Sequence, residues 1–311
     1  MQAFFVLPLD NKIKSLNPMQ KGEQRERQAI PQFSLVLCTI NRKEEVDKFL
    51  QSLARQTLSE FEVIIVDQNK DGLLDSVIAK WRKLLIIEHV KVDFRGLSKA
   101  RNFGMKYIKE GLIAFPDDDC EYKPSTLENA YIFMRQNPEA SIVIGKQSSK
   151  ICDTNENILK QAEEIKSPLN IFKSRAISFT IFARFSDINQ LGPVFFDEKL
   201  GVGAETKWGS GEETDFLIRA HRLGITIFKQ PAIEICHPVK ISSPRRCLHY
   251  GLGRYRVIKK NDLGCIIYAI NLLQPLVRLF LKSEYRFLLS HIYTSAGRSG
   301  LPLLFSNFRI R

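Results

Sequence analysis

The sequence predicts an α/β protein with a Rossmann-like, mostly parallel sheet flanked by helices and followed by a helical appendage. Short runs of apolar strand formers alternate along the chain with segments whose apolar residues recur at helical spacing. This alternation is typical of a parallel sheet covered on both faces. Several of the apolar runs end in polar or acidic residues, and the carboxyl ends of parallel strands are where such folds bind ligands.

The first unit is a strand, a helix and a second strand. FSLVLCT at 33–39 is a strand, and the segment 41–56 keeps a helical period through Val46, Phe49, Leu50 and Leu53. FEVIIVD at 61–67 is the next strand and ends in the polar turn QNKDG. LLIIEHV at 84–90 is a third strand.

The next unit leads to three adjacent aspartates. After Gly96, the segment 97–110 has helical spacing, and the apolar run GLIAFP that follows predicts a strand over 111–116. Asp117, Asp118 and Asp119 follow at once. Thr39 and Asp67 also end strands, so one crevice should collect all five side chains.

The second half predicts fewer regular elements. We expect a helix over 124–136, a strand over 141–146 and another strand in AISFTIFARF at 176–185. A glycine-rich loop over 191–211 leads to a helix that begins at Glu212 and ends at Gly224. The segment 225–238, ITIFKQPAIEICHP, then closes the core.

Charge divides the chain into regions. The whole sequence has 46 Lys and Arg against 34 Asp and Glu, and residues 238–311 alone hold 13 basic against two acidic residues, a net charge of 13 − 2 = +11. We therefore expect a polar lead-in over 1–32, a core domain over 33–237 and a basic helical tail over 238–311. The six scattered cysteines and the absence of a secretory leader predict reduced thiols in a cytoplasmic protein.

The tail favours attachment to a membrane surface. Residues 263–281 are a 19-residue apolar stretch interrupted by Asn271, Gln274, Pro275 and Arg278. A charge near the middle of a spanning helix is expensive, so the stretch predicts a helix lying on the anionic inner face of the cytoplasmic membrane. The alternative is that the tail helices pack on the catalytic domain.

Adjacent carboxylates repel one another and need a positive partner. Mg²⁺ and Mn²⁺ prefer carboxylate oxygens and keep coordination positions open for phosphates. The triple aspartate therefore indicates a divalent metal that carries a diphosphate. The alternative is an acidic turn before the helix that begins near Pro124.

Three blocks in order resemble the family 2 inverting glycosyltransferases of the GT-A fold over residues 33–237. LVLCTINRKEEVDKFLQSLARQTLSEFEVIIVDQN resembles the opening strand, helix and strand of that family. GLSKARNFGMKYIKEGLIAFPDDDCEYKPSTL resembles the block that ends in the DxD signature, and WGSGEETDFLIRAHRLG resembles the block with the catalytic base. The resemblance is to bacterial enzymes of surface-polysaccharide synthesis.

The resemblance implies a role for each matching residue. Asp117, Asp119 and His237 match positions near the metal, and Asp118 matches a position near the ribose. Thr39, Asn41, Asp67 and Asn69 match nucleotide-contacting positions at the first two strand ends, and Arg101 matches a basic residue near the base or diphosphate. Ile40 and Gln68 depart from the aromatic and acidic residues that the family often has there.

The family pattern also implies a catalytic base. The family helix opens with Glu-Asp, whereas Glu212 and Glu213 stand here. Glu213 is the expected base, with Asp215 in reserve; glutamate has the same chemistry and a longer reach. Trp208 and Glu212 are the expected wall for the acceptor or sugar. The alternative for these acidic residues is ordinary compensation of the helix dipole.

The predicted activity is metal-dependent, inverting transfer of a sugar from a nucleotide-diphosphate donor to an acceptor hydroxyl on a lipid-linked or surface glycan precursor. One rival is a sugar-phosphate nucleotidyltransferase, although CTINRKEEV lacks the glycine-rich phosphate loop expected there. The other is a non-catalytic protein that binds a polyanion through its tail; no nucleic-acid reader motif is found. Cys236, His237, Cys247 and His249 leave a zinc site as a further alternative.

Overall fold

The computed structural model describes residues 31–148, 161–174, 176–238, 243–281 and 288–300. Its first half is a parallel sheet, as the alternating pattern predicts. β1 (Phe33–Thr39) pairs in parallel with β2 (Phe61–Asp67) and β4 (Leu112–Ala114), and β2 pairs in parallel with β3 (Ile86–Lys91). Thr39 and Asp67 are register partners, so the carboxyl ends of β1 and β2 meet at one edge.

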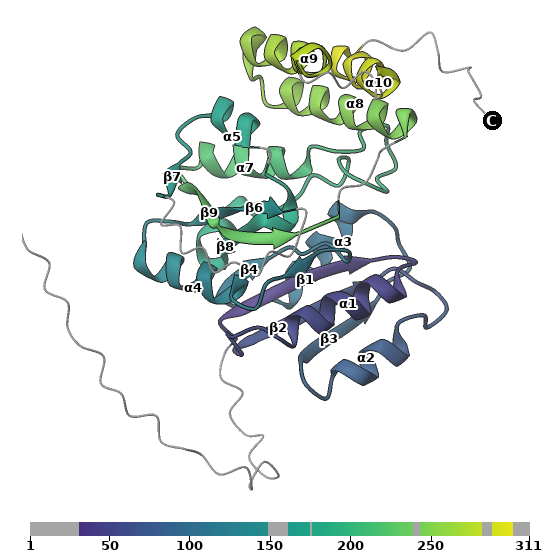
Figure 1. Ribbon diagram of the computed structural model, residues 1–311, viewed down its shortest axis with the longest axis vertical. Coiled ribbons are helices and arrows are strands. Elements are labelled where there is room, and N and C mark those ends of the chain that lie inside the picture. The colour runs from purple at the N-terminus through teal and green to yellow at the C-terminus, as the bar shows by residue number, and fades with distance from the viewer. Residues whose placement is uncertain (1–30, 149–160, 175, 239–242, 282–287, 301–311) are drawn as a thin grey trace, which may run out of the picture.

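Helices cover both faces of this sheet. Successive side chains of each strand point to opposite faces, and the strands are apolar on both, so each face must be buried. Leu35 and Leu37 of β1 pack in the core beneath α1 (Lys43–Leu53) and α2 (Asp75–Trp81). Val36 and Cys38 pack on the opposite face, beneath α3 (Leu97–Gly104). The α/β fold with flanking helices is thereby confirmed, and Figure 1 shows α1 and α2 together on one side of the sheet.

The second half extends the sheet with mixed strand directions. β8 (Ile181–Arg184) runs antiparallel between β4 and β6 (Ile142–Ser148), and β6 pairs in parallel with β9 (Ile227–Cys236). The remaining elements before the tail are β5 (Glu121–Tyr122), α4 (Thr126–Gln136), β7 (Glu163–Glu164), α5 (Pro168–Ser174), α6 (Phe185–Ile188) and α7 (Glu212–Arg222). The strand order is β3-β2-β1-β4-β8-β6-β9-β5, with β7 paired to β9.

The strand predicted over 176–185 is shorter than expected. Ser178–Thr180 form a 3₁₀ turn, and the strand begins only at Ile181. The Thr180 hydroxyl donates a hydrogen bond to the Ile177 carbonyl oxygen at 2.7 Å and accepts one from the Ile177 backbone N–H at 3.4 Å. A threonine side chain that bonds to nearby backbone competes with the sheet ladder in this way.

The tail is helical. α8 (Pro244–Lys260) begins with Ser243 as its N-cap, whose hydroxyl oxygen accepts a hydrogen bond from the Arg246 N–H at 3.3 Å. α9 (Gly264–Leu281) and α10 (Leu288–Ser299) complete a layer beyond α7 in Figure 1. In the described part of the chain, each helix falls short of the length or apolar character needed to cross a bilayer.

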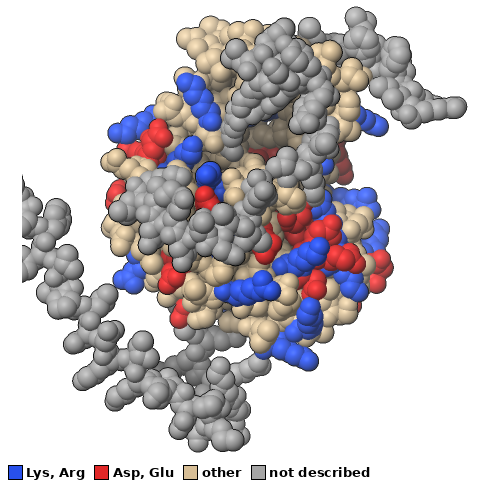
Figure 2. Space-filling model, viewed as in Figure 1, with Lys and Arg blue, Asp and Glu red and all other residues tan. Residues whose placement is uncertain are grey.

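Charged side chains are mixed on the face shown in Figure 2. Lys and Arg alternate with Asp and Glu over the region built by α1 and α2. This agrees with the nearly balanced charge of residues 1–237, which hold 46 − 13 = 33 basic and 34 − 2 = 32 acidic groups. The basic excess therefore belongs to the tail.

Candidate functional site

The carboxyl ends of β1, β2 and β4 are linked by polar side chains. The Thr39 hydroxyl donates a hydrogen bond to Asp118 Oδ2 at 2.8 Å. The Asn41 backbone N–H donates to Asn69 Oδ1 at 2.7 Å, and Asn41 adopts a left-handed φ of 57°. The strand ends predicted to form one crevice are therefore brought together.

Asp67 is fully buried and both of its carboxylate oxygens are engaged. Oδ1 accepts hydrogen bonds from the Asn69 backbone N–H at 2.9 Å and side-chain amide at 2.6 Å, and Oδ2 lies 2.9 Å from His89 Nε2. Burial opposes ionisation, but the hydrogen bonds from His89 and Asn69 outweigh it and lower the pKa of Asp67. Asp67 thus holds Asn69 and His89 in place at the carboxyl end of β2.

Asp118 and Asp119 share one arginine. Arg42 Nη1 lies 2.8 Å from Asp118 Oδ1 and 2.8 Å from Asp119 Oδ2. Burial raises the pKa of Asp118 to about 6, although the Arg42 charge and the Thr39 hydroxyl act in the opposite direction. Arg42, which directly precedes α1, was missed in the sequence because a basic residue before a helix normally lies in solvent.

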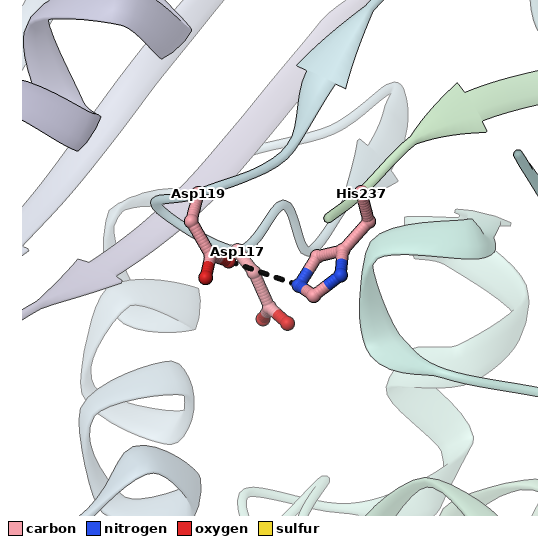
Figure 3. Close-up of side chains that lie close together, drawn as sticks. All are labelled: Asp117, Asp119 and His237. Atoms are coloured by element: carbon pink, nitrogen blue, oxygen red, sulfur yellow. Dashed lines mark ion pairs between the residues drawn. The ribbon is translucent and has the colours of Figure 1, made fainter. Parts of the chain in front are cut away.

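The side chains of Asp117, Asp119 and His237 lie close together (Figure 3). His237 Nε2 lies 2.9 Å from Asp119 Oδ1, and one potential ligand atom from each residue lies within 4.8 Å of the other two. The imidazole is stacked on Phe179, with ring centroids 4.6 Å apart and planes 1° from parallel. Two carboxylates and one oriented imidazole fit a divalent cation such as Mn²⁺ or Mg²⁺.

Arg101 lies beneath the site with only 1% of its surface exposed. Its Nη2 donates to Asp117 Oδ1 at 3.1 Å and to the Ser178 hydroxyl. Its Nη1 lies 3.7 Å from Glu212 Oε1 and 3.9 Å from Glu213 Oε1. Burial disfavours the charged guanidinium, but Asp117, Glu213 and Glu212 outweigh it and raise the pKa of Arg101. Arg101 therefore connects the triple aspartate to the glutamate pair.

The two glutamates differ in their access to the crevice. Glu212 has a side chain 5% exposed, and its Oε2 is buried without a hydrogen-bond partner. Glu213 is more open, with 14% of its side chain exposed, and its Oε1 accepts a hydrogen bond from the Ser178 backbone N–H at 3.3 Å. Burial raises the pKa of Glu213. A carboxylate that is partly open and biased toward holding a proton has the properties of a general base.

Asp215 is tied into the protein interior. It is fully buried, and its carboxylate accepts hydrogen bonds of 2.9 Å from Arg219 Nε, Lys260 Nζ and Asn261 Nδ2. The carboxylate oxygens of Asp215 therefore already accept hydrogen bonds from two cations and one amide of the chain. This arrangement favours Glu213 over Asp215 as the base.

Trp208 is half-buried in the loop before α7. The guanidinium of Arg256 lies over the indole, 4.6 Å from the ring centroid. A cation over an aromatic face is a stabilising contact, so Arg256 of the tail helps to fix this predicted acceptor wall.

The described residues give no support to the zinc alternative. Among the ranges that the structure covers, the single converging group of three or more potential ligands is the Asp117, Asp119 and His237 cluster. Cys236, Cys247 and His249 are outside it.

Comparison with known proteins identifies the family. The model of the family described as Glycosyl transferase family 2 matches residues 34–193. The chain belongs to glycosyl transferase family 2. The match covers the strand ends, the triple aspartate and Arg101, and the glutamate pair lies beyond it.

Several relatives of this family 2 member are glycosyltransferases by name. An uncharacterized glycosyltransferase of Haemophilus influenzae is 27% identical over 213 residues, 68% of this chain and 66% of that protein. The amylovoran biosynthesis glycosyltransferase AmsE of Erwinia amylovora is 28% identical over 151 residues, 44% of this chain and 57% of that protein. A poly(ribitol-phosphate) β-N-acetylglucosaminyltransferase of Staphylococcus aureus, TarP, is 29% identical over 36% of each chain. The matches thus span between about a third and two thirds of these relatives.

Solved structures share the fold. The crystal structure of Staphylococcus aureus TarS residues 1–349 has a TM-score of 0.54 at 16% identity, over 87% of this chain and 92% of that one. The mannosyltransferase PcManGT of Pyrobaculum calidifontis, in complex with GDP-Man and Mn²⁺, has a TM-score of 0.58 at 15% identity, over 88% and 77%. At these identities the comparison establishes the GT-A fold.

We predict that Glu212 makes the protein less stable as pH rises. Burial, followed by the Glu213 charge, raises the pKa of Glu212 from 4.5 to about 8. Between those values the folded protein holds a proton that the unfolded chain has released, so the free energy of unfolding falls with pH, by up to about 1.4 kcal/mol per pH unit. Glu212→Gln should make this slope shallower.

The measurement is urea unfolding from pH 5 to 8 in EDTA. Glu234→Gln is the matched control, because the hydrogen bond from Lys123 lowers the pKa of Glu234 and its contribution is constant in this window. An unchanged slope in Glu212→Gln would contradict the raised pKa.

Proposed function

We propose that this protein is a metal-dependent, inverting glycosyltransferase that uses a nucleotide-diphosphate sugar. The observation that carries the proposal is the arrangement of two acidic groups that are linked through Arg101. Asp117, Asp119 and His237 form the group that suits a cation, and Glu213 lies at the other terminal nitrogen of the Arg101 guanidinium. Arg101 contacts both groups from below. Family membership and the TarS and PcManGT folds support the same assignment.

One set of residues would act on the leaving diphosphate, and another would act on the acceptor. A divalent cation held by Asp117, Asp119 and His237 would stabilise the negative charge of the departing diphosphate. Thr39, Asn41, Asn69 and Asp118 line the strand ends where the nucleotide would bind, and Asp67 holds Asn69 there. Arg101 is too deeply buried to reach the nucleotide freely, so its role is to set the charge and position of the carboxylates.

Glu213 would act on the acceptor. Its carboxylate accepts the proton of the acceptor hydroxyl while the hydroxyl oxygen forms a bond to the anomeric carbon. The bond from that carbon to the diphosphate oxygen breaks at the opposite face, which inverts the configuration. The Ser178 N–H and the Arg101 guanidinium steady the carboxylate before the reaction and compensate its charge.

The acceptor that fits best is a lipid-linked or surface glycan precursor. The support is the relatives' names, which include amylovoran biosynthesis and poly(ribitol-phosphate) modification. Family membership also favours transfer over the two rivals, the sugar-phosphate nucleotidyltransferase and the non-catalytic polyanion-binding protein. This inference about the acceptor rests on analogy with relatives.

We also propose that the tail seats the protein on the inner face of the cytoplasmic membrane. Ile266, Ile270, Leu273 and Val277 are exposed on α9 at spacings that place them along one helix face. Leu288, Leu289 and Ile292 are exposed on α10. Neither helix contains an acidic residue, so an anionic lipid surface would meet no repulsion there.

Loss of the central metal ligand should abolish metal-dependent chemistry. Asp119→Ala removes a carboxylate that faces both His237 and Arg42, and we expect Mn²⁺-dependent hydrolysis of the accepted nucleotide sugar to fall at least about a hundred-fold. The assay is a panel of nucleotide sugars that includes UDP-GlcNAc and GDP-Man. The exposed Asp71→Ala is the control, and Mn²⁺-stimulated hydrolysis by Asp119→Ala at the rate of that control would refute the metal assignment.

Loss of the base should slow chemistry and spare donor binding. Glu213→Gln cannot accept a proton, so we expect kcat to fall by about 10²–10⁴. The affinity for UDP or GDP, measured by calorimetry with Mn²⁺, should stay within about two-fold. Glu205→Gln, on the exposed loop before α7, is the control; a kcat for Glu213→Gln equal to that control would exclude Glu213 as the base.

Polar substitutions in the apolar face should release the protein from membranes. Ile266→Asn with Leu273→Asn should reduce binding to vesicles containing phosphatidylglycerol at least about ten-fold in co-sedimentation, since two apolar side chains leave the interface. Ile132→Asn with Leu223→Asn is the control, because both residues are exposed outside the tail. The seating proposal would be refuted if the tail double variant and the control double variant bound the vesicles equally well.

A further inference from the structure

Helix α8 of the tail is bound directly to the loop that leads into the glutamate pair. The Gly209 backbone N–H donates a hydrogen bond to the His249 carbonyl oxygen at 3.1 Å. The Ser210 hydroxyl donates to the Tyr250 carbonyl oxygen at 2.8 Å. Both carbonyl groups belong to α8, and both donors lie within three residues of Glu212. The tail therefore contacts the protein where the predicted catalytic helix begins.

Two glycines allow backbone to touch backbone at this contact. A Cβ on Gly253 would overlap the Ser210 carbonyl oxygen and lie 2.7 Å from the Ser210 nitrogen. A Cβ on Gly211 would lie 2.6 Å from Val257 Cγ2, and Gly211 has a φ of 99°, which favours glycine. At Gly253 no side chain separates the two segments, so a shift of α8 toward the loop would displace Ser210.

A second contact holds the first turn of α7 from the same side. Asn261 Nδ2 and Lys260 Nζ each donate a hydrogen bond of 2.9 Å to the buried carboxylate of Asp215. Glu212 and Glu213 thus lie between two points, Gly211 and Asp215, that the tail fixes. Helix α7 has no side-chain N-cap of its own, so these contacts replace the usual local restraint on its first turn.

We propose that α8 is a positioning element of the active site, which holds Glu213 at the distance and angle that proton transfer needs. The inference rests on the proposed function, because it assumes that Glu213 is the base. On this proposal the tail takes part in catalysis. It would then not be an appendage, beginning at residue 238, that could be removed without loss of activity. A catalytic group that is misplaced by about 1 Å can lower the rate about a hundred-fold, so a close backbone contact that fixes the position of Glu213 would affect the rate.

Two glycines of α8 offer a matched pair of variants. Gly253 faces the loop, whereas Gly251 faces α10, where a Cβ would lie 2.5 Å from the Thr294 carbonyl oxygen and 2.9 Å from Gly297 Cα. Gly253→Ala and Gly251→Ala add the same methyl group two residues apart in one helix. The first must displace Ser210, and the second must displace α10, which lies on the outer side of α8 in Figure 1.

The variants are compared by Mn²⁺-dependent hydrolysis of nucleotide sugars and by hydrogen exchange of the Gly209 amide. We expect Gly253→Ala to lower kcat by about 10- to 100-fold, to leave KM for the donor within about two-fold and to speed exchange at Gly209. Gly251→Ala should keep kcat within about three-fold and preserve exchange at Gly209. A role in stability alone would affect both variants alike.

A second pair tests the Asp215 contact without adding atoms. Asn261→Ala removes a buried amide that bonds to Asp215, and Asn271→Ala removes a buried amide that bonds to Arg254 within the tail. We expect kcat to fall about ten-fold in Asn261→Ala, with the KM for donor unchanged, and to stay within about three-fold in Asn271→Ala. This pair remains informative if Gly253→Ala fails to fold.

The positioning role would be refuted if Gly253→Ala and Asn261→Ala both kept the wild-type kcat. It would also be refuted if the controls Gly251→Ala and Asn271→Ala lost as much kcat as the two test variants. Failure of the proposed function has a different signature, because the wild-type protein would then hydrolyse none of the nucleotide sugars. In that case exchange at Gly209 still decides the structural claim: unchanged exchange in Gly253→Ala would refute it.

Discussion

The site depends on the contacts of three adjacent aspartates with two arginines and one imidazole of the chain itself. Asp117 faces Arg101, Asp118 faces Arg42, and Asp119 faces both Arg42 and His237. Three like charges in a partly buried turn would otherwise protonate or push the turn into solvent. Because Arg42 comes from the turn after β1, Arg101 from α3 and His237 from the residue after β9, these contacts also bind the three segments to one another. A metal would therefore join a site that is already held together.

Arg101 extends this dependence to the second half of the protein. Its buried guanidinium faces Asp117 on one side and the Glu212 and Glu213 pair on the other. A buried cation without partners is costly, and so is each carboxylate without the cation. The proposed metal ligands and the proposed base thus lie on two sides of one buried guanidinium. This explains why the blocks that carry them, far apart in sequence, belong to a single site.

The sequence predicted the elements whose pattern is local. β1 and β2 have the bounds expected from their apolar runs, and the strand ends meet because parallel register requires it. The sequence did not reveal α2, which is only seven residues long, or the turn at Ser178, which depends on a local threonine hydrogen bond. Arg42 and His89 were missed because their partners are distant in sequence, and no periodicity encodes such pairs.

The charge of the tail is less available to a membrane than its count suggests. Lys260 bonds to Asp197 and Asp215, Arg254 lies over Phe172, and Arg256 lies over Trp208, so three of its basic residues serve internal contacts. Arg245, Arg246 and Lys259 are exposed. At about 1 kcal/mol each near an anionic surface, these three would contribute about 3 kcal/mol, no more than a few buried leucine or isoleucine side chains. Among the described residues of the tail, the exposed apolar side chains of α9 and α10 would therefore contribute more to seating than these three basic residues. Arg256 and Lys260 have the other task of fastening α8 to the loop and the helix that carry Glu213.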